Sequence, residues 1–157
     1  MPPETLSVNQ KVSFNSLYFQ LSNVMEKYGV DLLRIALAIV FIWFGALKVF
    51  GMSPAQDLVE KTIYWISPKF FVPFLGVWEV AMGFGLLIKR FIPITIVLML
   101  FHMAGTFLPF IILTKVCFDV FPFCPSLAGQ YIIKNLVLVT GALTVAGKYN
   151  GRIMKKS

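Results

Sequence analysis

Apolar residues along this chain gather into four long stretches, which are separated by short segments rich in polar residues and proline. A helix needs about 20 apolar residues to cross the roughly 30 Å hydrocarbon core of a bilayer. The four stretches have lengths of that order, and few charges interrupt them. The pattern therefore predicts an all-α integral membrane protein, a four-helix bundle. The predicted spans cover residues 30–50, 71–88, 91–113 and 131–146.

An amphipathic helix is predicted before the first span. Apolar residues recur there at spacings of three and four, at Phe14, Leu17, Tyr18, Leu21 and Val24, and polar residues occupy the rest of the helical wheel. This periodicity is typical of a helix that lies along a membrane surface.

A second surface helix is predicted between spans one and two. Residues 55–66 carry Leu58 and Ile63 on one helical face and Asp57 on another. We expect a short interfacial helix here that ends at the Ser67-Pro68 pair, because proline cannot continue a helix.

Composition excludes an ordinary soluble domain. The chain is 58% hydrophobic and 13% charged with a mean hydropathy of +0.81, whereas soluble domains are about 25% charged. The net charge of +7 does not indicate nucleic acid, because no basic run is interleaved with exposed aromatic residues. The basic residues are better interpreted as topology signals and as contacts to anionic lipid headgroups of the bilayer. No removable signal peptide is expected, since no short apolar core with a cleavage site precedes the first span.

Basic residues are unequally divided between the two sides of the predicted spans. One side holds Lys11, Lys27, Arg34, Lys89, Arg90, Lys148, Arg152, Lys155 and Lys156. The other holds Lys48, Lys61, Lys69, Lys115 and Lys134. The richer side marks the cytoplasm, so both termini are predicted to be cytoplasmic. The domain organisation is then a cytoplasmic N-terminal segment at 1–29, a transmembrane domain at 30–147 and a basic cytoplasmic tail at 148–157.

The two cysteines, Cys117 and Cys124, fall in the loop after span three, on the predicted outer face. Their spacing is too wide for a redox-active Cys-x-x-Cys motif but permits closure of a loop. We predict a structural disulfide, with a redox-cycling pair and two free thiols as the alternatives.

Glu79 is the most informative polar residue, because a charged side chain at the centre of a span costs roughly 2.5 to 3.5 kcal/mol on insertion scales. Lys48 near the outer end of span one and Lys134 near the start of span four enter the membrane from the same face. We predict that the three meet in the outer half of the bundle, where a Lys ammonium would keep the acid ionised. The alternatives are a structural or neutral Glu79 and lysines that simply extend to the interface.

His102, the only histidine, falls near the middle of span three. Structural hydrogen bonding is the simplest interpretation, and proton transfer or contact with a quinone is the functional alternative. Metal or haem ligation has little support, because no second His or Cys lies at helical ligand spacing, so no metal site is predicted. Asp31 and Arg34, three residues apart, are interpreted as a local ion pair at the headgroup level.

Three short motifs in order resemble the DoxX-like membrane proteins. Gly45-x-x-Lys48 closes span one, the sequence Gly-Val-Trp-Glu occupies residues 76–79, and Lys-Asn at 134–135 opens span four. The chain looks most like the YkgB type of small bacterial inner-membrane protein, over about residues 31–147. The family positions carried onto this chain are Arg34, Gly45, Lys48, Glu79, Lys134 and Asn135.

The resemblance implies a four-helix bundle in a bacterial inner membrane and links the chain to redox chemistry. The DoxX name belongs to a subunit of a thiosulfate:quinone oxidoreductase, and other relatives are connected with oxidative or chlorine stress. We therefore expect a role in redox or oxidative-stress physiology through a pocket for a quinone or a small anion. Glu79, Lys48 and Lys134 would be the reactive residues, and the binding residues would be Asn135, His102, Trp78 and Gly45.

Two other classes of function fit the same sequence. In one, the polar cluster only fixes the bundle and the protein is a non-enzymatic subunit that recruits a membrane or periplasmic redox protein. In the other, Glu79 and His102 are steps of a proton or small-solute conduit.

Overall fold

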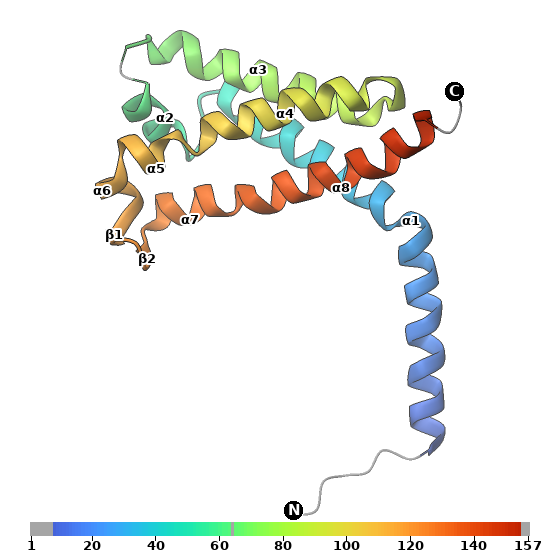
Figure 1. Cartoon of the computed structure of the whole chain (residues 1–157). Coiled ribbons are helices and arrows are strands. Elements are labelled where there is room, and N and C mark those ends of the chain that lie inside the picture. The colour runs from blue at the N-terminus through green and yellow to red at the C-terminus, as the bar shows by residue number, and fades with distance from the viewer. Residues whose placement is uncertain (1–7, 64, 155–157) are drawn as a thin grey trace, which may run out of the picture.

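The computed structural model describes residues 8–63 and 65–154, and side chains at 16–63 and 65–149. Its elements, shown in Figure 1, are α1 (Val8–Val49), α2 (Gln56–Thr62), α3 (Pro68–Leu87), the 3-10 turn η1 (Lys89–Phe91), α4 (Ile92–Thr106), α5 (Leu108–Ile112), α6 (Thr114–Cys117), β1 (Phe118–Val120), β2 (Cys124–Pro125), α7 (Leu127–Ile133) and α8 (Asn135–Met154). The helix α2 and the β1–β2 hairpin lie at one end of the bundle, and the turn between α3 and α4 lies at the other (Figure 1).

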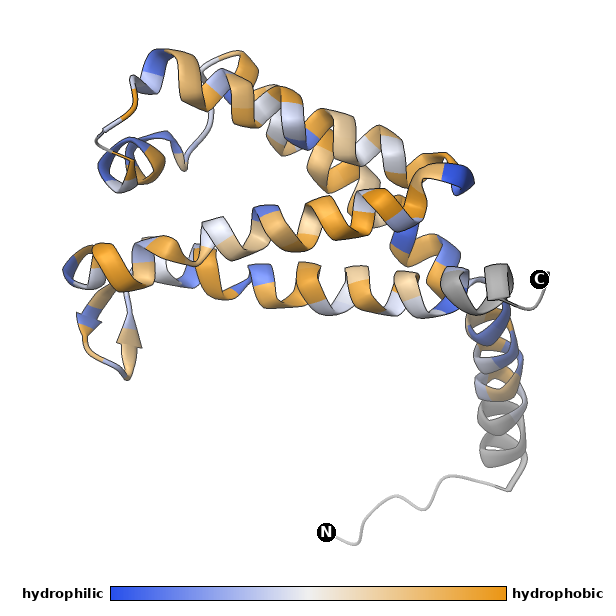
Figure 2. Ribbon diagram, turned by 45° about the horizontal axis from the view of Figure 1, so that its top comes forward, coloured by the Kyte–Doolittle hydropathy of each residue, from blue (hydrophilic) through white to orange (hydrophobic). Residues whose placement is uncertain are grey.

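Four helical segments are long and apolar enough to cross a membrane, as the hydropathy pattern predicts. They cover Ser16–Val49, Pro68–Leu87, Lys89–Ile112 and Leu127–Tyr149. Their outward faces carry exposed apolar side chains, and orange dominates their ribbons in Figure 2. Such faces suit lipid better than water. The chain is therefore a multi-pass membrane protein.

The N-terminal amphipathic helix does not stand as a separate element, contrary to the prediction. Residues 8–49 form one continuous α-helix of 42 residues. No proline interrupts this segment, so the helix has no strong breaker at which to stop. Its N-terminal part nevertheless turns away from the bundle, across the direction of the spans (Figures 1 and 2). Apolar side chains such as Leu17 and Leu21 are exposed there, and the side chain of Phe14 lies outside the described residues.

Other predicted boundaries shift for local reasons. The helix between spans one and two ends at Thr62, before Ser67, and Pro68 begins α3, a position that proline favours. The third span is broken at Phe107, and α5 follows with Pro109 in its first turn. The fourth span is broken at Lys134, between α7 and α8. The predicted tail at 148–157 continues α8 as far as Met154, and residues 155–157 lie outside the described part of the chain.

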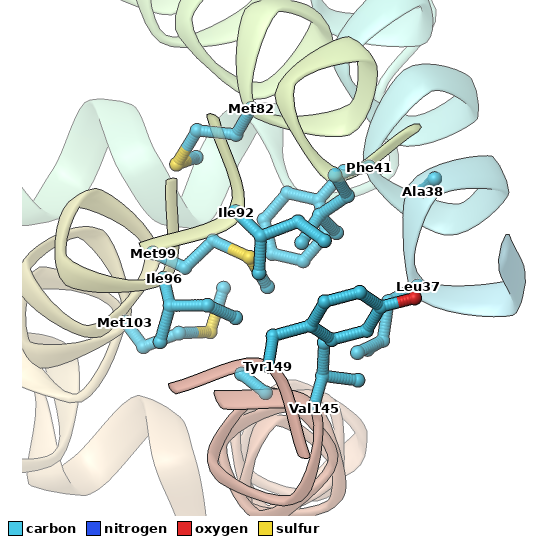
Figure 3. Close-up of a cluster of buried hydrophobic side chains, with 12 residues drawn as sticks. Leu37, Ala38, Phe41, Met82, Ile92, Ile96, Met99, Met103, Val145 and Tyr149 are labelled. Atoms are coloured by element: carbon cyan, nitrogen blue, oxygen red, sulfur yellow. The ribbon is translucent and has the colours of Figure 1, made fainter. Parts of the chain in front are cut away.

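The apolar core fills the half of the bundle nearer the turn between α3 and α4. Figure 3 shows side chains from all four spans meeting there, with thioethers of α4 filling the space between branched and aromatic residues. Methionine suits this position because its flexible side chain adapts to irregular gaps. The buried members are Leu37, Ala38, Phe41, Met82, Leu86, Ile92, Ile96, Met99, Met103, Ala142, Val145 and Tyr149.

The predicted disulfide between Cys117 and Cys124 is absent, and that prediction was wrong. Both thiols are free; Cys117 is buried and Cys124 is exposed. The hairpin register explains the separation, because Cys124 pairs with Val120 while Cys117 lies at the end of α6. The Cys117 thiol instead donates a 3.5 Å hydrogen bond to the carbonyl oxygen of Pro109.

Candidate functional site

The site is organised by a close crossing of α1 and α3. A β-carbon on Gly45 would lie 2.6 Å from the carbonyl oxygen of Gly76 and 2.9 Å from the Cβ of Glu79, so only glycine fits there. Lys48 and Glu79 each follow one of these glycines by three residues, about one helical turn. The crossing therefore brings the two side chains to the same level. Gly45, predicted as a binding residue, lies in this helix contact and is not among the residues that line the nearby cavity.

Glu79 is held at both carboxylate oxygens. The Lys48 ammonium lies 2.5 Å from Oε2, and the Nε2 of His102 lies 2.8 Å from Oε1. Only 6% of Glu79 is exposed, in the second span. A buried carboxylate that is both ion-paired and hydrogen-bonded avoids most of the cost of an isolated charge. The three residues form what we call the Glu79 cluster: Lys48, Glu79 and His102.

Lys134 does not join this cluster, contrary to the prediction. It lies at the junction between α7 and α8 and its side chain is exposed. Within the described part of the chain it has no ion-pair partner, and it does not line the cavity. The break between the helices turns the neighbouring residue inward instead. His102, which sequence reasoning treated separately, occupies the place expected for the second lysine.

Asn135 forms a second polar contact in the same region. Its Nδ2 donates to the Oγ1 of Thr106 at 3.1 Å, and that hydroxyl donates to the carbonyl oxygen of Met103 at 2.8 Å. Thr106 was not among the predicted site residues, although its position four residues after His102 places both on one face of α4.

A cavity of about 680 Å³ joins these two polar contacts. The Glu79 cluster, Trp78, Thr106 and Asn135 all contribute to its wall, and most of the remaining lining is apolar. Ligand pockets in proteins typically measure about 300 to 1,000 Å³. The cavity lies in the half of the bundle that contains α2, and the apolar core of Figure 3 closes the other half.

Part of the cavity wall is shared with the outer surface of the bundle. Phe101 and Phe74 line the cavity and are 78% and 49% exposed. Both belong to the membrane-spanning segments, so the surface around this part of the cavity faces lipid.

A separate polar cluster lies at the opposite end of the bundle. The Arg34 guanidinium donates from Nη1 to the carbonyl oxygens of Leu86 and Leu87, at 2.7 and 3.0 Å. The expected pairing with Asp31 is long, at 3.9 Å. Asp31 instead accepts from the Lys148 ammonium at 2.8 Å and the Tyr149 hydroxyl at 2.5 Å, two partners that sequence reasoning missed.

Within residues 8–63 and 65–154, no group of three or more His, Cys, Asp or Glu side chains is placed to hold a metal ion.

The family model described as DoxX matches residues 29–112, more than half of the chain. The chain belongs to the DoxX family. No curated protein and no solved structure matches it. The segment matched to DoxX contains the whole Glu79 cluster and Arg34, while Asn135 and both cysteines lie beyond it.

Proposed function

We propose that this DoxX-family protein binds a membrane quinone in the cavity beside Glu79 and acts in redox or oxidative-stress physiology. One observation carries the proposal: a buried, ion-paired carboxylate stands in the wall of a largely apolar cavity inside a membrane-spanning bundle. Ionisable residues within membrane spans are costly, and they mark binding sites or proton pathways more often than they serve packing alone.

The chemistry of the wall favours a lipid-soluble ring over a small anion. The charge of Lys48 is neutralised by Glu79 at 2.5 Å, so no unpaired cation of this cluster is left to attract an anion. Aromatic side chains such as Trp78 and Phe74 supply surfaces for a flat ring. Because Phe101 and Phe74 are also exposed toward lipid, a ligand dissolved in the bilayer can approach from that side.

The Glu79 cluster supplies the means to handle a proton. The His102 ring is oriented by its contact with Oε1 of Glu79, and Lys48 stabilises the ionised carboxylate. A histidine oriented by a carboxylate is suited to exchange a proton with an oxygen of a bound ligand. The apolar core that fills the opposite half of the bundle favours a closed binding pocket over a conduit for protons or solutes.

Saturable quenching of Trp78 fluorescence by a short-tailed benzoquinone tests the proposal. Trp43 and Trp65 are exposed and are replaced with Phe, which leaves Trp78 as the reporter in the cavity wall. We expect saturation in the purified protein and in Glu26→Gln, whose carboxylate is exposed on α1, and an affinity at least about tenfold weaker in Glu79→Gln.

A matched pair of leucine variants on α8 distinguishes quenching by quinone bound in the cavity from quenching by quinone dissolved in detergent. Leu138 lines the cavity, whereas Leu136 is exposed outside it. Leu138→Phe should weaken binding and Leu136→Phe should not. Quenching that rises linearly with quinone in every variant would overturn the proposal and favour a structural subunit instead.

We also propose that the protein is a YkgB-type member of a bacterial inner membrane, with both termini in the cytoplasm. The division of basic residues supports this orientation. The exposed apolar residues on the N-terminal part of α1 support its lying along the cytoplasmic membrane surface.

A membrane-impermeant maleimide applied to intact cells tests the orientation. It should label exposed Cys124, and it should not label Lys89→Cys in a Cys124→Ser background, since Lys89 lies in the exposed turn between α3 and α4. Labelling of Lys89→Cys but not of Cys124 would show that the protein has the opposite orientation in the membrane.

A further inference from the structure

Two polar side chains of α4 line the same cavity one helical turn apart. His102 and Thr106 are separated by four residues, which places them on one face and about 6 Å apart along the helix axis. Each is bound to a residue from a different helix, His102 to Glu79 on α3 and Thr106 to Asn135 on α8. The cavity therefore has two polar stations with apolar wall around them.

Each station has hydrogen-bonding capacity that the protein does not use. Among the described residues, His102 bonds only through Nε2, which leaves Nδ1. Asn135 uses one N–H of its amide on Thr106, which leaves a second N–H and the carbonyl oxygen. The Thr106 hydroxyl is already both donor and acceptor. The groups with spare capacity are therefore the His102 ring and the Asn135 amide, one at each station.

Unused polar groups in an apolar, membrane-embedded cavity are costly unless a ligand or water satisfies them. Two such groups, one at each station on different helices, can be satisfied together by a flat ring that carries oxygen atoms at opposite ends, whereas a ring with a single oxygen would leave one of them unsatisfied.

We propose that the cavity binds its ligand at both stations together, with His102 and Asn135 holding oxygens at opposite ends of one ring, and so selects para-hydroquinones. The inference rests on the proposed function and adds the ligand's substitution pattern and a positioning role for Asn135. While His102 is neutral and donates Nε2–H to ionised Glu79, its Nδ1 is an acceptor and takes a hydrogen bond from a ring hydroxyl. The Asn135 amide accepts a hydrogen bond from the second ring hydroxyl through its carbonyl oxygen, or donates to that hydroxyl through its free N–H.

Binding of two ligands with the same alkyl tail tests the proposal. One is a para-hydroquinone and the other is the phenol that lacks the second hydroxyl. We expect the wild-type protein to bind the hydroquinone about tenfold more tightly, a typical difference for one hydrogen bond in an apolar site. In Asn135→Leu, which keeps the side-chain size and removes its polar groups, this preference should disappear because hydroquinone affinity falls and phenol affinity does not. Thr140→Val, a loss of polarity on the exposed face of α8, should keep the preference.

The outcomes separate this inference from the proposed function. If hydroquinone and quinone bind saturably but the preference over the phenol is absent, or survives in Asn135→Leu, the two-station inference is wrong and the pocket remains. If neither binds saturably to the wild-type protein, both proposals fail. Thermal unfolding in detergent checks that each variant is folded, and Asn135→Ala replaces Asn135→Leu if the latter does not fold.

Discussion

Gly76 and Gly45 meet backbone to backbone where α3 crosses α1. A β-carbon on Gly76 would lie 2.6 Å from the carbonyl oxygen of Gly45 and 2.9 Å from the Cβ of Lys48. Close approach at small residues is a common means of packing helices in membranes, where the hydrophobic effect does not drive their association. Here it also determines whether Lys48 can reach Glu79, so the packing contact and the candidate site depend on the same two residues.

Gly76→Ala should therefore weaken both the packing of α1 against α3 and the candidate site. Overpacking of a tight contact costs about 1 to 3 kcal/mol, and the helices must separate to relieve it, which lengthens the Lys48–Glu79 pair. We expect a lower unfolding midpoint in detergent and weaker quinone binding. Gly29→Ala is the matched control, because nothing lies within 4 Å of a β-carbon at Gly29, and alanine is the better helix former. An unchanged midpoint for Gly76→Ala would contradict the close crossing.

Lys48→Met should be among the most destabilising single changes in the half of the bundle that contains the cavity. It leaves the buried Glu79 carboxylate without its cation, and removing one partner of a buried pair costs about 3 to 5 kcal/mol. Lys134→Met provides the contrast, since Lys134 is exposed and surface changes usually stay within about 0.5 kcal/mol. Unfolding in denaturant measures both. Glu79→Gln in the Lys48→Met background should recover part of the loss, because it removes the unpaired charge, and a purely additive result would argue against the pairing.

The cysteines should differ in reactivity. Burial raises the pKa of the Cys117 thiol, and the thiolate is the reactive form, whereas Cys124 is exposed. Alkylation of the folded, purified protein near neutral pH should modify Cys124 alone, and Cys117 should react only after unfolding or at strongly alkaline pH. Mass spectrometry of the alkylated peptides reads this out. A peptide pair that remains joined until a reductant is added would contradict the free thiols.

Hydropathy alone was sufficient to predict the four spans, because a stretch of apolar residues long enough to cross a bilayer has few alternatives. The Lys48–Glu79 contact could also be predicted from the sequence, since it depends on depth in the membrane and on glycines that permit close packing. The contact of His102 with Glu79 could not be predicted, because it depends on how α4 is rotated about its axis, which a nearly uniform apolar sequence does not encode. The predictions for Lys134 and for the cysteines were wrong for local reasons. A break between α7 and α8 decides where the Lys134 side chain points, and the hairpin register decides where Cys124 lies relative to Cys117.

Arg34 should stabilise the fold without affecting the cavity. Its guanidinium donates to the carbonyl oxygens of Leu86 and Leu87, at the end of α3, where helical carbonyls lack partners within the helix. Hydrogen bonds to charged groups contribute about 1.5 to 3 kcal/mol, so Arg34→Met should lower the unfolding midpoint. Arg90→Met removes an exposed cation from the nearby turn and should change the midpoint little. Because Arg34 lies at the end of the bundle opposite the cavity, quinone affinity measured on the folded protein should be the same in Arg34→Met as in wild type, and a matching loss of affinity would mean that the two ends are coupled.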